Sequence, residues 1–177
     1  MASRHRIVRT AEGTAERDSI SPFVEGWLRE RPDLDPWPLA VLGRVERISS
    51  RLQRQAEGWL RPLGLSWESF CLIITLRRSG PPFALRPTDL YRDSLLSSGA
   101  TTTRIDRVEK MGWVHRQPDP SDGRSVMVIL TPSGQALADQ AIALHFQCLA
   151  QSLSGLELND RTQLIVLLTK ALAALEA

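Results

Sequence analysis

Small hydroxyl side chains and long cations gather in the middle of the chain. Ser98, Thr101 and Thr102 are short enough to bond to DNA base edges or phosphates at close range. Arg107 and Arg124 follow, and their guanidinium groups reach further. For any single threonine, capping or packing of its own helix is an almost equal alternative. These residue types suit DNA recognition that depends on the placement of a few side chains.

The surrounding pattern predicts how these residues are held. Two short helical patterns, Pro87–Asp93 and 97–111, are followed by Gly112, which suits the left-handed position after a helix. The period then changes to the alternation of a β-hairpin, and the turn at 119–124 contains Pro and Asp-Gly. Helix, turn, helix and hairpin together predict a winged helix-turn-helix.

The rest of the chain predicts a mainly α fold with this small β-wing. Helices are expected at 23–30, from Asp35-Pro36 to about Leu60, after an N-cap at Ser66, at 132–153, and at 160–175 with Asn159 as N-cap. A short third strand is expected at 83–85. We predict that the chain has four segments. They are a disordered N-terminus at 1–18, N-terminal helices forming a dimerisation scaffold and pocket wall at 19–62, the winged DNA-binding region at 63–131, and C-terminal dimerisation helices at 132–177.

Apolar residues form one stripe on the long helix that begins at Asp35-Pro36, here called the first long helix, and another on the last helix. Stripes of this kind are expected to be buried against another element. They could pack on the winged region of the same chain, but we favour the seam of a homodimer because both stripes need a partner. The residues are Leu39, Leu42, Val45, Ile48, Leu52 and Trp59 on the first long helix, and Leu164, Leu167, Leu168, Ala171, Leu172 and Leu175 on the last.

Composition narrows the function classes. The formal net charge is +2, and residues 86–131 hold seven basic and six acidic side chains, so no broad basic stripe is present. Two Cys without disulfide-like spacing, no signal peptide and no membrane-length apolar run predict a cytoplasmic protein that does not engage membranes. His145 and Cys148 are too few for a metal site. No catalytic motif is present, so neither enzyme activity nor a cofactor is expected.

Several spaced motifs resemble the MarR family of bacterial transcription factors. They are Arg107-Val108-Glu109 with Gly112, Asp122-Gly123-Arg124, and Ile129-Leu130-Thr131 with Gly134. The resemblance implies a homodimer on a palindromic double-stranded DNA site, usually as a repressor. It also implies that Arg124 enters the minor groove, oriented by Asp122; their alternative is a surface pair of little consequence. A rival class is a winged-helix adaptor that binds protein, but such a chain is expected to lose Arg124 and the hydroxyl-rich helix.

The segments 27–35 and 76–82 are similar to the urate-responsive PecS/HucR/TamR subgroup, which binds a small anionic molecule. The resemblance implies a ligand site at Trp27, Cys71, Arg104 and Arg116, with Cys71 standing where the subgroup has Asp. A thiol carries no charge at neutral pH unless its pKa is lowered. Three alternatives follow for Cys71: a small buried hydrophobe, a site retuned to another anion or aromatic effector, or a thiolate redox sensor.

Overall fold

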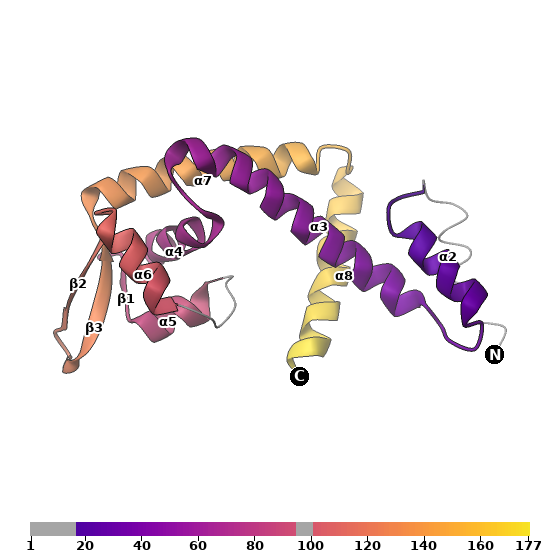
Figure 1. The fold of residues 1–177 in the computed structure, drawn as a ribbon, viewed down its shortest axis with the longest axis horizontal. Coiled ribbons are helices and arrows are strands. Elements are labelled where there is room, and N and C mark those ends of the chain that lie inside the picture. Colours follow the sequence, from indigo (N-terminus) through magenta and orange to yellow (C-terminus); the bar gives the residue numbers. More distant parts are fainter. Residues whose placement is uncertain (1–16, 95–100) are drawn as a thin grey trace. The chain divides into compact units, whose positions relative to one another are not determined.

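The computed structural model describes residues 17–94 and 101–177, apart from the side chains at positions 101, 123 and 124. The chain forms two compact units whose boundary falls after Gln55, inside a long helix (Figure 1). The disorder predicted for residues 1–18 lies outside the described residues except at Arg17 and Asp18. The division into four segments stays a prediction.

The first unit contains α2 (Ser21–Glu30) and most of α3 (Trp37–Leu60). Both predicted helices are confirmed, with Pro22 in the first turn of α2 and the Asp35 carboxylate accepting a hydrogen bond from the Trp37 amide at 3.3 Å. A small apolar cluster joins α2 to α3. Its buried members are Ile20 and Val24, packed against Leu28 and Ala40.

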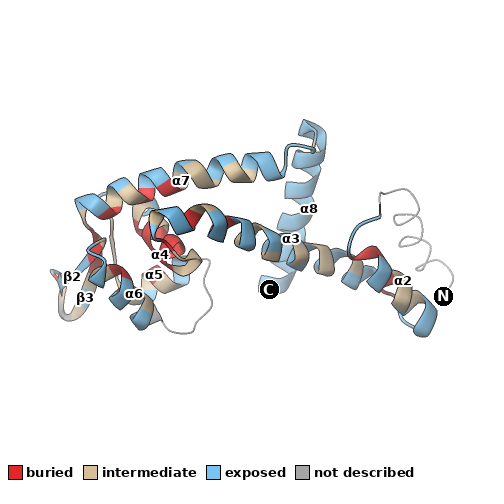
Figure 2. Ribbon diagram, turned by 45° about the horizontal axis from the view of Figure 1, so that its top comes forward, coloured by how far each residue is buried: buried red, intermediate tan, exposed pale blue. Residues whose placement is uncertain are grey.

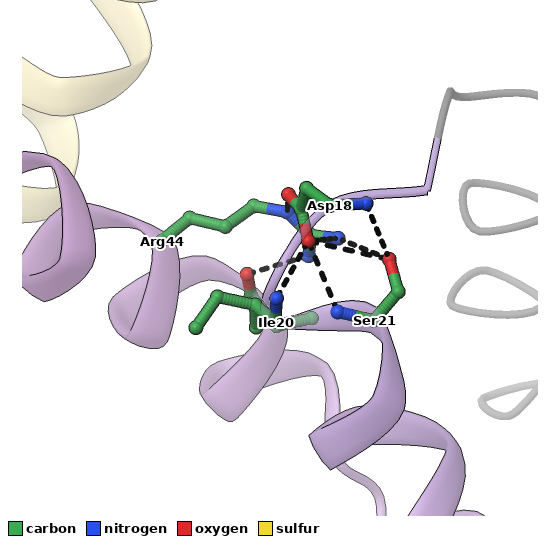
Figure 3. A network of polar contacts seen from close by, with 5 residues as sticks. Asp18, Ile20, Ser21 and Arg44 are labelled. Atoms are coloured by element: carbon green, nitrogen blue, oxygen red, sulfur yellow. Dashed lines mark hydrogen bonds and ion pairs between the residues drawn. The ribbon is translucent and has the colours of Figure 1, made fainter.

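Asp18 fastens the start of α2 to α3 (Figure 3). Its Oδ1 accepts hydrogen bonds from the amides of Ile20 at 2.8 Å and Ser21 at 3.0 Å, and the Arg44 Nε donates to its Oδ2 at 2.7 Å. Burial raises the pKa of the Asp18 carboxyl, but the amides and the Arg44 guanidinium outweigh burial and hold the pKa at about 2. Asp18 therefore satisfies amides at the helix start that lack an intrahelical partner.

Replacing Asp18 by alanine should loosen α2. Loss of a capping carboxylate costs about 1 kcal/mol, so amide hydrogen exchange in α2 should accelerate about fivefold at neutral pH. Because the folded pKa lies below the ordinary value of 3.8, this stabilisation is complete above pH 4 and is lost as pH falls through about 2. Asp33→Ala, which removes an exposed carboxylate paired only with Arg31 among the described residues, is the control. Equal acceleration by both variants would contradict the capping role.

The second unit carries the winged helix-turn-helix. Its elements are the end of α3, the 3-10 turn Arg61–Leu63, α4 (Trp67–Arg78), β1 (Ala84–Leu85), α5 (Pro87–Asp93), α6 (Thr101–Lys110), β2 (Val114–Asp119), β3 (Asp122–Leu130), α7 (Pro132–Ser152) and α8 (Leu158–Glu176). The mainly α class with a small wing is confirmed. The predicted N-caps Ser66 and Thr131 accept hydrogen bonds from Ser69 and Gly134, and Gly112 is left-handed with φ 75°.

The three strands form an antiparallel sheet in the order β1-β3-β2. Val114 pairs with Leu130, and Arg116 pairs with Val128. Because side chains alternate along a strand, Arg116 points to the same face as the buried Val114. That face lies against α6, so the register directs Arg116 toward the second helix of the helix-turn-helix.

One hydrophobic core, to which α4 contributes several residues, holds the winged region together (Figure 2). Phe70, Ile73 and Leu76 of α4 are fully buried. Helices α3, α5, α6 and α7 and strand β3 also contribute buried residues to it: Leu60, Leu90, Ile105, Val108, Val128 and Ala138. This shared core fixes α5, α6 and the hairpin as one body.

The last helix begins at a different residue from the one predicted, and none of its residues is buried by the described part of the chain. Its N-cap is Glu157, not Asn159, because the Glu157 side chain accepts from the Asp160 amide while the Asp160 carboxylate accepts from the Glu157 amide at 3.2 Å. This reciprocal box satisfies two donors at once, which an N-cap at Asn159 cannot do. All of α8 is exposed (Figure 2).

Candidate DNA-binding surface and effector pocket

Helix α6 presents a polar face opposite its buried one. Ile105 and Val108 are fully buried against the core, while Thr102 and Arg107 are exposed. Burial of Ile105 and Val108 therefore leaves Thr102 and Arg107 on the solvent side of the helix, as a recognition helix requires. Thr101 lies in the first turn, but its side chain is not described. Ser98 lies outside the described residues, and so does the predicted start of this helix at residue 97.

Arg116 of β2 binds two carboxylates of α6. Its Nη2 lies 2.5 Å from Oδ1 of Asp106, and its Nη1 donates to Glu109. Glu109 also accepts the Arg116 backbone amide at 2.8 Å. The Arg116 side chain is 27% exposed and Glu109 is 34% exposed, so solvent screens their contact only in part, whereas Asp106 is 58% exposed and its contact is more strongly screened. These contacts of Arg116 with Asp106 and Glu109, here called the clamp, connect the recognition helix α6 to strand β2 of the wing.

The wing turn is anchored by a residue that the sequence analysis missed. Asp119 is 6% exposed and accepts hydrogen bonds from the Ser121 amide at 2.8 Å and from the Arg86 Nε at 2.7 Å. The Ser121 amide and hydroxyl, followed by Arg86, hold the pKa of Asp119 at about 2. The Asp-Pro-Ser order is a signal for such a turn. Asp122 accepts from the Ser125 hydroxyl at 2.8 Å.

The base of the wing is joined to the start of α7 by close backbone contacts. The Thr131 amide donates to the Trp113 carbonyl at 3.0 Å, and the Thr131 hydroxyl donates to the Gly112 carbonyl at 2.8 Å. A Cβ atom at Gly134 would lie 2.0 Å from the Trp113 carbonyl oxygen. The signature Gly134 is thus a site of close approach between α7 and the residues that follow α6.

Of the four predicted ligand residues, Cys71 and Arg104 lie close enough to interact electrostatically. Cys71 is 1% exposed, and burial first, then Glu68, raises the pKa of its thiol to about 12, although Arg104 lowers it. Cys71 is therefore a neutral thiol, which fits the buried-hydrophobe alternative and counts against a thiolate sensor. Arg116 is held by the α6 clamp. Trp27 lies on α2 in the first unit and is 49% exposed. Convergence of all four residues stays a prediction.

A cavity of about 580 Å³ lies between α4 and α7, and Cys71 is part of its wall. Neither Arg104 nor Arg116 lines it. Among residues 17–94 and 101–177, no group of three or more His, Cys, Asp and Glu side chains could hold a metal ion. No helix in the same residues has the length and apolar character to cross a membrane.

Comparison with known proteins agrees with this architecture. Residues 65–126 match the MarR family model. The chain is 34% identical to the transcriptional regulator PecS of Dickeya dadantii over 149 residues, which cover 84% of this chain and 90% of PecS. It is 32% identical to the multiple antibiotic resistance protein MarR of Escherichia coli over 133 residues, covering 74% of this chain and 90% of that protein.

A solved structure shows the same fold. The crystal structure of a Cys-to-Ser variant of Escherichia coli MarR with operator DNA superposes with a TM-score of 0.68 at 28% identity, covering 78% of this chain and 98% of that one. These relatives are regulators, not enzymes. With the winged region, its signature residues and the extent of the match to PecS, the chain belongs to the MarR family of transcriptional regulators.

Proposed function

We propose that the protein is a homodimeric repressor that binds a palindromic operator and leaves it when a small anionic effector binds. The observation that carries the DNA-binding part is helix α6, which buries Ile105 and Val108 and exposes Thr102 and Arg107 beside a two-stranded wing. The fold match to a MarR variant solved with operator DNA supports the same use of these elements. By the family pattern, Ser98, Thr101 and Arg124 complete the DNA-contacting set, and Asp122 orients Arg124.

Uncovered apolar residues support the homodimer. On α8, Leu164, Leu168 and Leu172 are at least 40% exposed, and on α3 Leu42 and Ile48 are at least half exposed. Apolar surface of this extent favours a partner, and a second copy of the chain offers matching stripes. A twofold dimer also suits a palindromic site, since it places two recognition helices roughly 34 Å apart.

Footprinting on the DNA upstream of the protein's own gene tests the proposal, together with sedimentation of the free protein. We expect a dimer that protects two half-sites about one helical turn apart, and binding that weakens steeply with salt. A reporter fused to that DNA should rise in expression when the gene is deleted. A monomer, or a protein that protects no DNA at low salt, would overturn the proposal and favour the protein-binding adaptor.

Replacing Arg124 by alanine should weaken operator binding by about 1–3 kcal/mol, which is roughly a 5- to 150-fold rise in Kd. The reason is loss of a groove or phosphate contact at the wing. The measurement is fluorescence anisotropy with a labelled operator. Arg29→Ala removes the same charge from an exposed side chain on α2 and should leave Kd unchanged. If the Arg124→Ala protein is folded and binds as tightly as wild type, the wing assignment is wrong.

A further inference from the structure

We propose that Asp106 of α6 determines part of the operator sequence, because its carboxylate accepts a hydrogen bond from the amino group of a cytosine in each half-site. This inference rests on the proposed function, since it requires α6 to enter the major groove of DNA. Asp106 is not among the DNA-contacting residues that the sequence motifs imply. Three properties of the side chain support the assignment: its place on α6, its contact with Arg116, and its chemistry as a pure acceptor.

Asp106 lies on the face of α6 that points away from the core. Ile105 and Val108 are buried on one side of the helix, whereas Thr103, Asp106 and Lys110 are exposed on the other. Their spacing of three and four residues places these three side chains in one row along the helix. The recognition helix of a homeodomain contacts bases over about two turns, and Asp106 is in the second turn of α6. A side chain at this position can therefore reach base edges.

Arg116 holds the Asp106 carboxylate by one of its two oxygens. The Arg116 Nη2 donates to Oδ1 of Asp106 at 2.5 Å, and none of the hydrogen bonds among the described residues involves Oδ2. The Asp106 side chain is 58% exposed, so a partner can approach the carboxylate from solvent. A side chain that is already fixed at one oxygen loses less conformational entropy on binding than a free one. The contact with Arg116 thus prepares the carboxylate for a base.

Nearby cations make this carboxylate compatible with a DNA surface. An isolated carboxylate on a recognition helix would be repelled by the phosphates, but Asp106 is paired with Arg116. Arg116 also pairs with Glu109, and the exposed Arg107 and Lys110 of the same helix supply further positive charge. Lys110 follows Asp106 by four residues, a spacing at which opposite charges attract each other. The charge of Asp106 is therefore offset on the protein side of the interface.

An ionised carboxylate only accepts hydrogen bonds, and this restricts the base that it can recognise. In the major groove, cytosine presents the donor N4 amino group, whereas guanine presents the acceptors N7 and O6 and thymine presents the acceptor O4. Adenine presents an amino donor beside the acceptor N7, whose lone pair repels a carboxylate. Cytosine is therefore the base that fits Asp106.

Selection from a pool of duplexes with randomised half-sites tests this assignment on the full-length protein, with wild type and Asp106→Asn compared. Wild type should enrich a cytosine at one position of each half-site. Asparagine keeps an oxygen that can accept from Arg116 but adds an amide donor, and this pair of groups suits N6 and N7 of adenine. The Asp106→Asn protein should therefore enrich adenine at that position and leave the other positions unchanged.

Fluorescence anisotropy with the selected duplexes measures the size of the preference. For wild type, adenine in place of that cytosine in one half-site should raise Kd about 5- to 150-fold. For Asp106→Asn the order should reverse, so that the adenine duplex binds more tightly. Urea unfolding should show nearly the wild-type midpoint for Asp106→Asn, because Arg116 keeps its ion pair with Glu109.

Glu109→Gln is the matched control, because it removes the same charge from the same helix and from the same partner, Arg116. Glu109 is half-buried and also accepts the Arg116 backbone amide, so it is directed to β2. This variant should change Kd by a similar factor for all duplexes and keep the preference for cytosine. If Glu109→Gln shifts the preferred base as Asp106→Asn does, the effect comes from the clamp, and the assignment of Asp106 is wrong.

The selected sequences also separate this inference from the proposed function. If wild type enriches a palindrome that Asp106→Asn enriches unchanged, or a palindrome without a preferred cytosine, the DNA-binding regulator stands and the role of Asp106 is wrong. If wild type enriches no duplex, the proposed function is overturned, and the recognition of cytosine by Asp106 with it.

Discussion

Replacing Gly134 by alanine should cost the winged-helix unit about 3–5 kcal/mol of unfolding free energy, near the top of the range for single substitutions. The added Cβ would lie 2.0 Å from the Trp113 carbonyl oxygen and 2.8 Å from the Trp113 carbonyl carbon. These are backbone atoms, so no flexible side chain can move aside. Relief requires α7 to shift away from the base of the wing, where the Thr131 amide and hydroxyl hold it.

Urea unfolding of the wild type and the Gly134→Ala variant measures this cost, with an unchanged m-value showing that both unfold from a compact native state. Gly58→Ala is the matched control, because Gly58 lies within α3 and a Cβ there meets nothing within 4 Å. That variant should gain roughly 0.5–1 kcal/mol from helix propensity. If Gly134→Ala unfolds at the wild-type urea concentration, the close approach of α7 to Trp113 is wrong.

Most of the fold was predictable because its signals are local. Pro87–Asp93 was predicted with the bounds that α5 has, and the caps at Ser66 and Thr131 and the left-handed Gly112 follow from residue type and position alone. The start of α8 was missed for an equally local reason. Asn159 is a good N-cap by itself, but the reciprocal Glu157–Asp160 pair satisfies two amides and moves the start.

The site was less predictable because its contacts cross between elements. The family resemblance implies that Arg116 contacts a ligand, and that role stays a prediction. Strand register and the packing of β2 on α6 bring Arg116 to Asp106 and Glu109. Spacing cannot supply that pairing, since it depends on tertiary packing. The charge state of Cys71 was open for the same reason, as burial by α4 and its neighbours decides it.

Replacing Arg116 by methionine should lower the unfolding free energy by about 2–3 kcal/mol and weaken operator binding by at least about tenfold. Methionine keeps the length and apolar stem but leaves Asp106 without its partner and Glu109 with only the Arg116 backbone amide. Two uncompensated carboxylates on the recognition helix repel DNA phosphates and each other. The free energies of unfolding and of operator binding are both measured, with operator Kd followed at fixed salt.

A double-mutant cycle separates the clamp from general charge effects. Arg116→Met combined with Glu109→Gln should show a coupling of about 1–2 kcal/mol, because the partly buried pair is screened only in part. The same cycle on Arg29 and Glu30, an exposed pair on α2 at 3.0 Å, should give less than about 0.5 kcal/mol. A coupling energy near zero at both pairs would show that the ion pair between Arg116 and Glu109 does not fix the position of α6.

If Arg116→Met instead keeps full stability and DNA affinity but loses its response to an anionic effector, Arg116 is a ligand residue, as the family resemblance implies. If the ion pairs of Arg116 hold α6 in place, Arg116→Met loses stability and DNA affinity even when no ligand is present, because these ion pairs form in the free protein.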